Sequence, residues 1–164
     1  HLLPDLATRF TVTEECVAFF RPRQPAPFMP DRFPVFIEHA SGAYGFPIFG
    51  HPGVKVGFHH DGQVVTAEQR PGIPRTEVLE RLAAYLAQRL PDAAGPLLLA
   101  KTCLYTNTWN GDFVLDRLPG APNVVVASPC SGHGFKFAPL VGRIAADLAL
   151  SGSSPDWSPR FALA

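Results

Sequence analysis

The sequence predicts an α+β fold with a mostly antiparallel sheet, and three observations lead to this class. Runs rich in Val, Phe, Tyr and Thr, bounded by Pro, Gly and Asp, recur along the 164 residues and are typical of strands. Two amphipathic segments have apolar residues at helical spacing. Hydrophobic residues make up 46% of the chain and charged residues 17%, which is enough apolar material for a sizeable core.

The elements follow in a clear order. The expected strands are residues 9–20, 33–39, 43–49, 54–60, 97–108, 113–118 and 123–128. A helix is predicted over 76–90, where Pro91 ends it, and a second over 138–150, with Pro139 tolerated in its first turn. The tail that follows residue 150 is expected to lie as an extension on the surface.

Composition excludes several classes of protein. The 14 basic and 14 acidic residues cancel, which argues against a nucleic-acid binder or a protein held electrostatically at a membrane. No apolar run approaches the ~20 residues that span a bilayer. Three widely spaced cysteines suit neither a disulfide framework nor a structural zinc site, and they predict a reducing, cytoplasmic setting. Because the chain starts with His1 in mid-pattern, a processed or truncated product is expected.

The strand at 54–60 carries the first candidate site. Alternation places Lys55, Gly57 and His59 on one face and the apolar residues on the other. A cation and an imidazole separated by a glycine could leave room for an anionic or electron-rich ligand. The other interpretation is a solvated sheet face with one satisfied histidine.

The strand at 97–108 carries the second candidate. Cys103, Tyr105 and Asn107 share one of its faces. A free cysteine is either a small buried hydrophobic residue or a reactive thiol, and nothing local to the strand decides between the two.

A third candidate is the stretch CSGHGFKF, residues 130–137, between the last expected strand and the last expected helix. Gly132 and Gly134 would permit positive φ and a close approach of the backbone to a ligand. The helix N-terminus and Lys136 would favour an anion. The stretch does not match G-x-G-x-x-G, because Phe137 stands at the third glycine position. A tight turn with an exposed lysine is the alternative.

Other chemistries fit the spacing less well. Ser131 or Cys130 with His133 could form a nucleophile and base, but these residues are too close in sequence for the usual geometry. Adjacent histidines on a strand point to opposite faces, so no metal site is predicted. An unrelated thiol or serine hydrolase is kept as a third hypothesis.

Taken in order, FPVFIEH, YGFPIFG, GVKVGFHH, KTCLYTNT, FVLDRLPGAPNVVVAS and SGHGFKF resemble one family. It is the flavin-dependent amine oxidases typified by monomeric sarcosine oxidase and N-methyltryptophan oxidase. The resemblance implies FAD as the cofactor and a small N-methyl amino acid or similar amine as the substrate. It also implies that O2 is reduced to hydrogen peroxide.

The resemblance implies roles beside the flavin. Cys103 would attach the flavin covalently, Lys55 would serve the activation of oxygen, and His59 would lie near the substrate amine. The backbone contacts to the flavin would come from Gly132, His133 and Gly134.

The resemblance also implies a substrate pocket. Tyr44 and Tyr105 would line it, and Lys136 would bind the substrate carboxylate. Two departures leave the substrate open. TWNGDF replaces the usual T-P-D-x-x-F after the cysteine strand, and Cys130 stands where an aromatic residue commonly precedes the serine.

The family's G-x-G-x-x-G turn, and the arginine that shares the carboxylate, have no counterpart in the sequence. We therefore expect residues 1–95 to be a portion of the substrate-binding (catalytic) domain. Residues 96–164 would be the last strands and C-terminal helix of an FAD-binding domain that lacks its N-terminal Rossmann half. Such a chain is expected to be inactive alone, to hold FAD poorly if at all, and to need the missing half or a homo-oligomer. The alternative is a non-catalytic binding or scaffold module of the same family.

Overall fold

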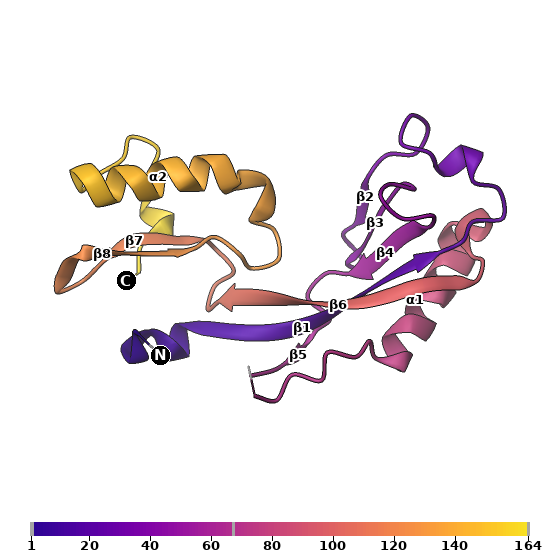
Figure 1. Cartoon of the computed structure of the whole chain (residues 1–164), viewed down its shortest axis with the longest axis horizontal. Coiled ribbons are helices and arrows are strands. Elements are labelled where there is room, and N and C mark those ends of the chain that lie inside the picture. Colours follow the sequence, from indigo (N-terminus) through magenta and orange to yellow (C-terminus); the bar gives the residue numbers. More distant parts are fainter. Residues whose placement is uncertain (1, 67, 164) are drawn as a thin grey trace. The chain divides into compact units, whose positions relative to one another are not determined.

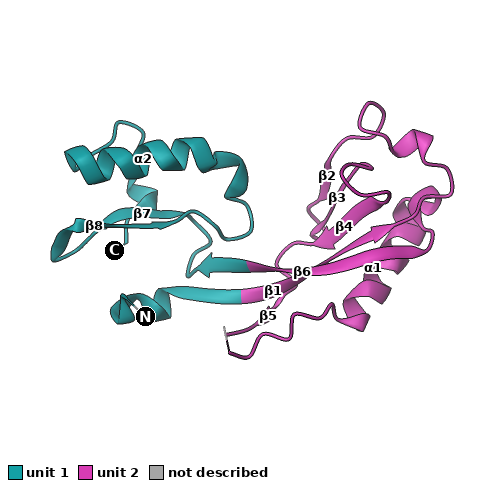
Figure 2. Cartoon of the chain, in the orientation of Figure 1, with its two compact units in different colours: residues 1–12, 105–164 teal, residues 13–104 magenta. Residues whose placement is uncertain are grey.

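The computed structural model of the chain describes residues 2–66 and 68–163. It forms two compact units, residues 1–12 with 105–164 (unit 1) and residues 13–104 (unit 2), coloured separately in Figure 2. The division falls within two long strands, β1 (Phe10–Phe20) and β6 (Leu97–Thr108), each of which runs from one unit into the other. The sequence predicts a boundary between residues 95 and 96, which divides a substrate-binding part from an FAD-binding part. That division is one of function, and it stays a prediction.

Unit 2 is built on an antiparallel sheet (Figure 1). The strand order is β2 (Phe36–Glu38), β3 (Ala43–Phe46), β4 (Val54–Phe58), β1 and β5 (Gln63–Val64), and β6 also pairs with β1. The four neighbouring pairs along this order are antiparallel, which confirms the predicted sheet. The strands expected at 33–39 and 43–49 are shorter than predicted, since Pro34 and Pro47 lack the N–H that a ladder needs.

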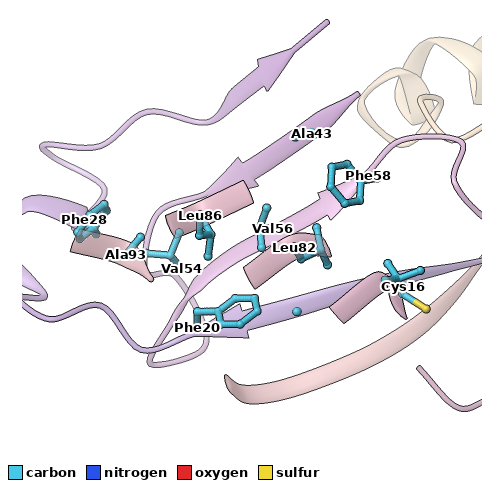
Figure 3. Close-up of a cluster of buried hydrophobic side chains, with 12 residues drawn as sticks. Cys16, Phe20, Phe28, Ala43, Val54, Val56, Phe58, Leu82, Leu86 and Ala93 are labelled. Carbon is cyan, nitrogen blue, oxygen red and sulfur yellow. The ribbon is translucent and has the colours of Figure 1, made fainter. Parts of the chain in front are cut away.

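The core of unit 2 lies between this sheet and α1 (Thr76–Arg89). Val78, Leu82 and Leu86 of the helix are buried with Val54 and Val56 of β4, as Figure 3 shows for most of the cluster. Helical spacing of apolar residues therefore predicted the buried stripe correctly. The helix ends as expected, with the short 3-10 turn Pro91–Ala93 directly after it.

Unit 1 contains a hairpin and a helix. β7 (Val114–Leu118) and β8 (Ala121–Ser128) pair antiparallel, and α2 (Ala138–Ser151) contacts both strands. Leu115, Ile144 and Leu148 form its buried cluster. Gly152 ends α2 in the left-handed conformation at φ 76, which glycine adopts without strain.

The tail that follows α2 is more than a surface extension. Trp157 packs against the buried cluster of unit 1, and its Nε1 donates a hydrogen bond to the Leu115 carbonyl at 2.6 Å. Phe161, in the 3-10 turn Pro159–Phe161, packs against the same cluster. The tail therefore covers the hairpin, because the small cluster gains apolar area from it. Across residues 2–66 and 68–163, the helices are all too short or too polar to cross a bilayer.

Candidate functional site

Lys55 lies in unit 2 beneath two aromatic rings. The register of β3 and β4 pairs Phe46 with Lys55 and Tyr44 with Gly57. The Lys55 Nζ lies 4.9 Å from the centre of the Phe46 ring and 5.8 Å from that of Tyr44. Ring faces attract cations at these distances, so the half-buried ammonium is held by them.

The space beside Gly57 is occupied by Tyr44. A Cβ at Gly57 would lie 2.8 Å from the Tyr44 hydroxyl oxygen and 2.9 Å from its Cζ. The sequence-based expectation that this glycine leaves room for a ligand is therefore wrong. An aromatic residue opposite a glycine leans over the missing side chain and covers the backbone there.

His59 falls just outside the strand. β4 ends at Phe58, and the backbone N–H of His59 bonds to the Gly42 carbonyl at 2.8 Å. Its ring lies 4.0 Å from the ring of His60, which has the uncommon φ of 58. Strand alternation thus holds for Lys55 and Gly57, while a turn sets the direction of His59.

Cys103 and Lys55 act on each other electrostatically within unit 2. Cys103 is half-buried and is not in a disulfide. Burial raises the pKa of its thiol, the Glu15 charge raises it further, and Lys55 acts to lower it. Burial also lowers the pKa of Lys55, against an opposing effect of the Cys103 thiolate. The fold therefore brings a cation to a free thiol that lies 48 positions away in sequence.

The turn at 130–137 belongs to unit 1 and is anchored to the end of β6. The Ser131 N–H donates to the Thr106 carbonyl at 2.9 Å, and the Thr108 N–H donates to Ser131 Oγ at 3.2 Å. Ser131 is fully buried and has φ 45, while Gly132 has φ 76. Two consecutive left-handed residues thus reverse the chain, and buried hydrogen bonds hold them there.

Gly134 differs from its prediction. Its φ is −82, which any residue adopts, so positive φ is not the reason for this glycine. A Cβ there would collide with the Pro129 carbonyl oxygen. The turn's own backbone therefore requires glycine at this position.

The outer side of the turn is exposed. The Lys136 ammonium donates to the His133 carbonyl at 3.1 Å and lies 4.9 Å from the centre of the Phe137 ring. Among the described residues it forms no ion pair. Phe135 is 96% exposed, and the His133 ring stacks on Phe113 at 4.9 Å. The turn therefore presents a cation and an apolar ring to whatever lies against it.

The predicted site residues divide between the units. Unit 2 contains Tyr44, Lys55, His59 and Cys103. Unit 1 contains Tyr105, half-buried on β6, together with Gly132, His133, Gly134 and Lys136. Direct contacts join Tyr44 to Lys55 and Lys136 to His133.

Sequence reasoning missed Glu15, which the fold buries in β1 and whose charge acts on Cys103. The available signal was a pair of acidic residues, Glu14 and Glu15, directly before the apolar run of residues 16–20 in the same strand. Charged residues in such a place are almost never fully buried without a reason.

Unit 1 also contains a cavity of about 480 Å³. Phe113, Phe137, Leu140 and Phe161 supply much of its apolar lining. An ion pair between Arg160 and Asp112, at 2.7 Å, lies at its border. The apolar lining of this cavity offers a surface against which another apolar segment could pack.

Comparisons with known proteins give a consistent result. The sequence model of the family described as FAD dependent oxidoreductase matches residues 2–148. The chain is 41% identical over 160 residues to monomeric sarcosine oxidase from Streptomyces avermitilis, covering 93% of this chain and 42% of that one. It is 38% identical over 132 residues to N-methyl-L-tryptophan oxidase from Salmonella typhimurium, covering 77% and 35%.

The fold agrees with a solved structure. The deglycating enzyme fructosamine oxidase from Aspergillus fumigatus matches with a TM-score of 0.72 at 25% identity, over 96% of this chain and 39% of that one. The chain thus spans about two fifths of the length of these proteins.

Proposed function

The chain belongs to the FAD-dependent oxidoreductase family, and from this we propose that it is the C-terminal portion of an oxidase of N-methyl amino acids. The reaction would be the oxidation of a secondary amine with O2 as the electron acceptor. The observation that carries the proposal is the electrostatic interaction of Lys55 with the free thiol of Cys103. A thiol that can bond to a flavin ring and a cation close to it are the two groups that such a site needs.

The residues present fit part of a flavin site. Cys103 is half-buried rather than sealed in the core, so an approaching ring could reach its sulfur. The turn at Ser131–Lys136 is open on its outer side, where His133 and Lys136 are exposed. These residues would hold the flavin ring, and the sequence offers no glycine-rich turn for the pyrophosphate.

FAD, when bound, would supply the redox chemistry, taking a hydride from the amine and passing electrons to O2. The chain's own contribution would be electrostatic. The Lys55 ammonium, kept in place by Phe46 and Tyr44, would stabilise negative charge that develops as oxygen is reduced. Burial lowers the pKa of Lys55, so the surroundings that strengthen its field also weaken its hold on the proton.

Substrate binding would use the remaining predicted residues. Lys136 has an exposed ammonium outside any described ion pair, and it would neutralise the carboxylate of an amino acid. Tyr44 and Tyr105 would line the pocket, with His59 near the amine. In this proposal Tyr44 also positions Lys55, because the two side chains are in contact.

A non-catalytic role is the second candidate. The cavity of unit 1 and the exposed side chains of Phe135 and Leu150 form apolar surface that would favour a missing half or a second copy as partner. No nucleic-acid or membrane partner is proposed. A reducing, cytoplasmic location is part of the proposal, since all three cysteines are free.

The test is a chimaera in which this chain replaces the matching 42% of the Streptomyces avermitilis sarcosine oxidase. We expect a yellow protein that releases hydrogen peroxide when sarcosine or another N-methyl amino acid is added. The Lys55→Met variant should keep the flavin and lower the rate of oxygen consumption by roughly 10² to 10³. Lys136→Met should raise KM for carboxylated amines while flavin content stays unchanged.

A chimaera that folds and binds FAD but oxidises none of the N-methyl amino acids would favour the scaffold role. Equal oxygen consumption by the Lys55→Met chimaera would remove the proposed role of Lys55.

A further inference from the structure

Glu15 is a buried carboxylate without a cation. Its side chain is 1% exposed, and it accepts hydrogen bonds from Thr13 Oγ1 at 2.6 Å and from the Asp61 N–H at 3.1 Å. Among the described residues, no lysine, arginine or histidine forms an ion pair with it. Its neighbour Glu14 differs, because Arg70 Nε donates to the Glu14 carboxylate at 2.8 Å. Burying an unpaired charge is unfavourable, so Glu15 calls for a physical reason.

The register of the sheet places Glu15 on the face that carries Lys55. Phe19 pairs with Lys55 and Val17 with Gly57 across β1 and β4. Alternation then puts Glu15, two residues before Val17, on the same face of β1. The Glu15 carboxylate also packs directly against Gly62, where a Cβ would collide with it. It is therefore fixed in position and cannot turn outward to water.

Cys103 lies on β6, the strand that pairs with β1. Arg70 donates both to the Glu14 carboxylate and to Thr102 Oγ1, so Glu14 and Thr102 share one face of the β1–β6 pair. Alternation then places their neighbours Glu15 and Cys103 together on the other face, the one that carries Lys55. We propose that the buried carboxylate of Glu15 restrains the reactivity of Cys103, with Lys55 as the opposing group. Glu15 is in this view a positioning residue, which acts only through the sulfur.

The electrostatics agree with this geometry. Burial raises the pKa of Cys103 most and the Glu15 charge comes second. Cys16 also raises this pKa, whereas Lys55 and Arg70 act to lower it. Only the thiolate is nucleophilic, so a higher pKa means less reactive sulfur at neutral pH. The chain would in this way keep its thiol intact against adventitious electrophiles. The inference rests on the proposed function, because that proposal makes Cys103 a flavin attachment point. The test below does not depend on the proposed function.

The test is the pH dependence of Cys103 alkylation by iodoacetamide in the flavin-free 164-residue chain. The reaction forms an S–C bond, releases iodide and gives the thiol proton to solvent. Peptide mass spectrometry distinguishes Cys103 from Cys16 and Cys130. Because no flavin or substrate is present, the outcome is independent of whether the oxidase proposal holds.

Glu15→Gln removes the charge and keeps one acceptor oxygen for the Asp61 N–H, while the Thr13 hydroxyl, which can donate or accept, can take a bond from the new amide nitrogen. We expect the midpoint of the pH–rate profile to move to lower pH. A tenfold larger acid dissociation constant would raise the thiolate fraction tenfold and lower its nucleophilicity roughly threefold, giving about threefold faster alkylation below the midpoint. The plateau at high pH should fall by the same threefold. Lys55→Met should move the midpoint the other way.

Glu14→Gln is the matched control, as it changes an adjacent buried carboxylate that already has Arg70 as partner. Its midpoint should stay near that of the wild-type chain. An unmoved midpoint in Glu15→Gln, an equal change in Glu14→Gln, or a higher plateau, which indicates simple loosening, would each overturn the proposal. If Glu15→Gln does not fold, Lys55→Met still tests the proposal. A midpoint that fails to rise in Lys55→Met would show that the charges on this face of the sheet do not act on Cys103, and would overturn it.

Discussion

Gly57→Ala tests directly whether Tyr44 fills the space beside this glycine. The new methyl group would lie 2.8 Å from the Tyr44 hydroxyl oxygen, 2.9 Å from Cζ and 3.0 Å from Cε1. Contacts this short require movement, and the ring of Tyr44 can tilt more easily than the backbone. Overpacking of this kind destabilises by about 1–3 kcal/mol. Replacing glycine also stabilises by ~0.4–1 kcal/mol through the unfolded chain, so the net loss should be near 1 kcal/mol.

The background with Tyr44→Ala reverses the expected sign. With the ring absent, Gly57→Ala should stabilise by ~0.4–1 kcal/mol, and the coupling between the two sites should be roughly 1–3 kcal/mol. Native-state hydrogen exchange of the β4 amides gives the free energies for unit 2 separately from unit 1. If Gly57→Ala has the same effect in both backgrounds, Tyr44 does not cover Gly57. The interpretation that Gly57 leaves room for a ligand would then be supported.

Three further predictions concern stability. Leu82→Ala, at a fully buried helix position, should destabilise unit 2 by about 2–5 kcal/mol in the same hydrogen-exchange measurement. If the amides of this variant are as protected from exchange as those of the wild-type chain, Leu82 does not contribute to the core. Ser131→Ala should destabilise unit 1 by about 1–3 kcal/mol, because it leaves the buried Thr108 N–H without its acceptor. Urea unfolding followed by the fluorescence of Trp109 and Trp157, both in unit 1, measures this loss, and an unchanged midpoint would refute it. The fold raises the pKa of Cys103 from 9.0, so the wild-type chain should lose stability relative to Cys103→Ala as pH rises above 9.0 through the folded pKa. Below pH 9.0 the two proteins should differ by a constant free energy of unfolding, measured by urea unfolding followed by circular dichroism. A difference that changes with pH below 9.0 would contradict a raised pKa of Cys103 in the folded chain.

Patterns within one element predicted the fold well. The alternation in residues 54–60 identified Val54, Val56 and Phe58 as core residues, and all three are buried. The spacing of residues 76–90 gave α1 within one residue at its C-terminal end. Both patterns report which face of a single element meets the core, and that information is contained in the sequence.

Features that depend on two elements could not be predicted. Tyr44 covers Gly57 because β3 and β4 pair in one register, and a slip of one residue would turn the ring away. The electrostatic coupling between Lys55 and Cys103 depends on the placing of β4 and β6 around β1. The burial of Glu15 has the same origin, since Asp61 and Gly62, which are distant in sequence, pack against its carboxylate.

The turn at 130–137 shows a different limit. Its glycines correctly indicated a tight reversal of the chain. The prediction, however, gave positive φ to the glycines because of their residue type alone. Ser131 takes a positive φ because buried hydrogen bonds to Thr106 and Thr108 hold it, whereas Gly134 is needed for close approach to Pro129. Local backbone strain of this kind follows from tertiary contacts.

The central claim is that Cys103 is the covalent anchor of a flavin. The most direct measurement is peptide mass spectrometry of the acid-precipitated chimaera with the Streptomyces avermitilis oxidase. We predict that the peptide containing Cys103 carries the added mass of FAD, and that the Cys103→Ser chimaera releases its flavin into the supernatant. A folded chimaera whose flavin is released entirely by acid, or is found on another residue, would contradict the account.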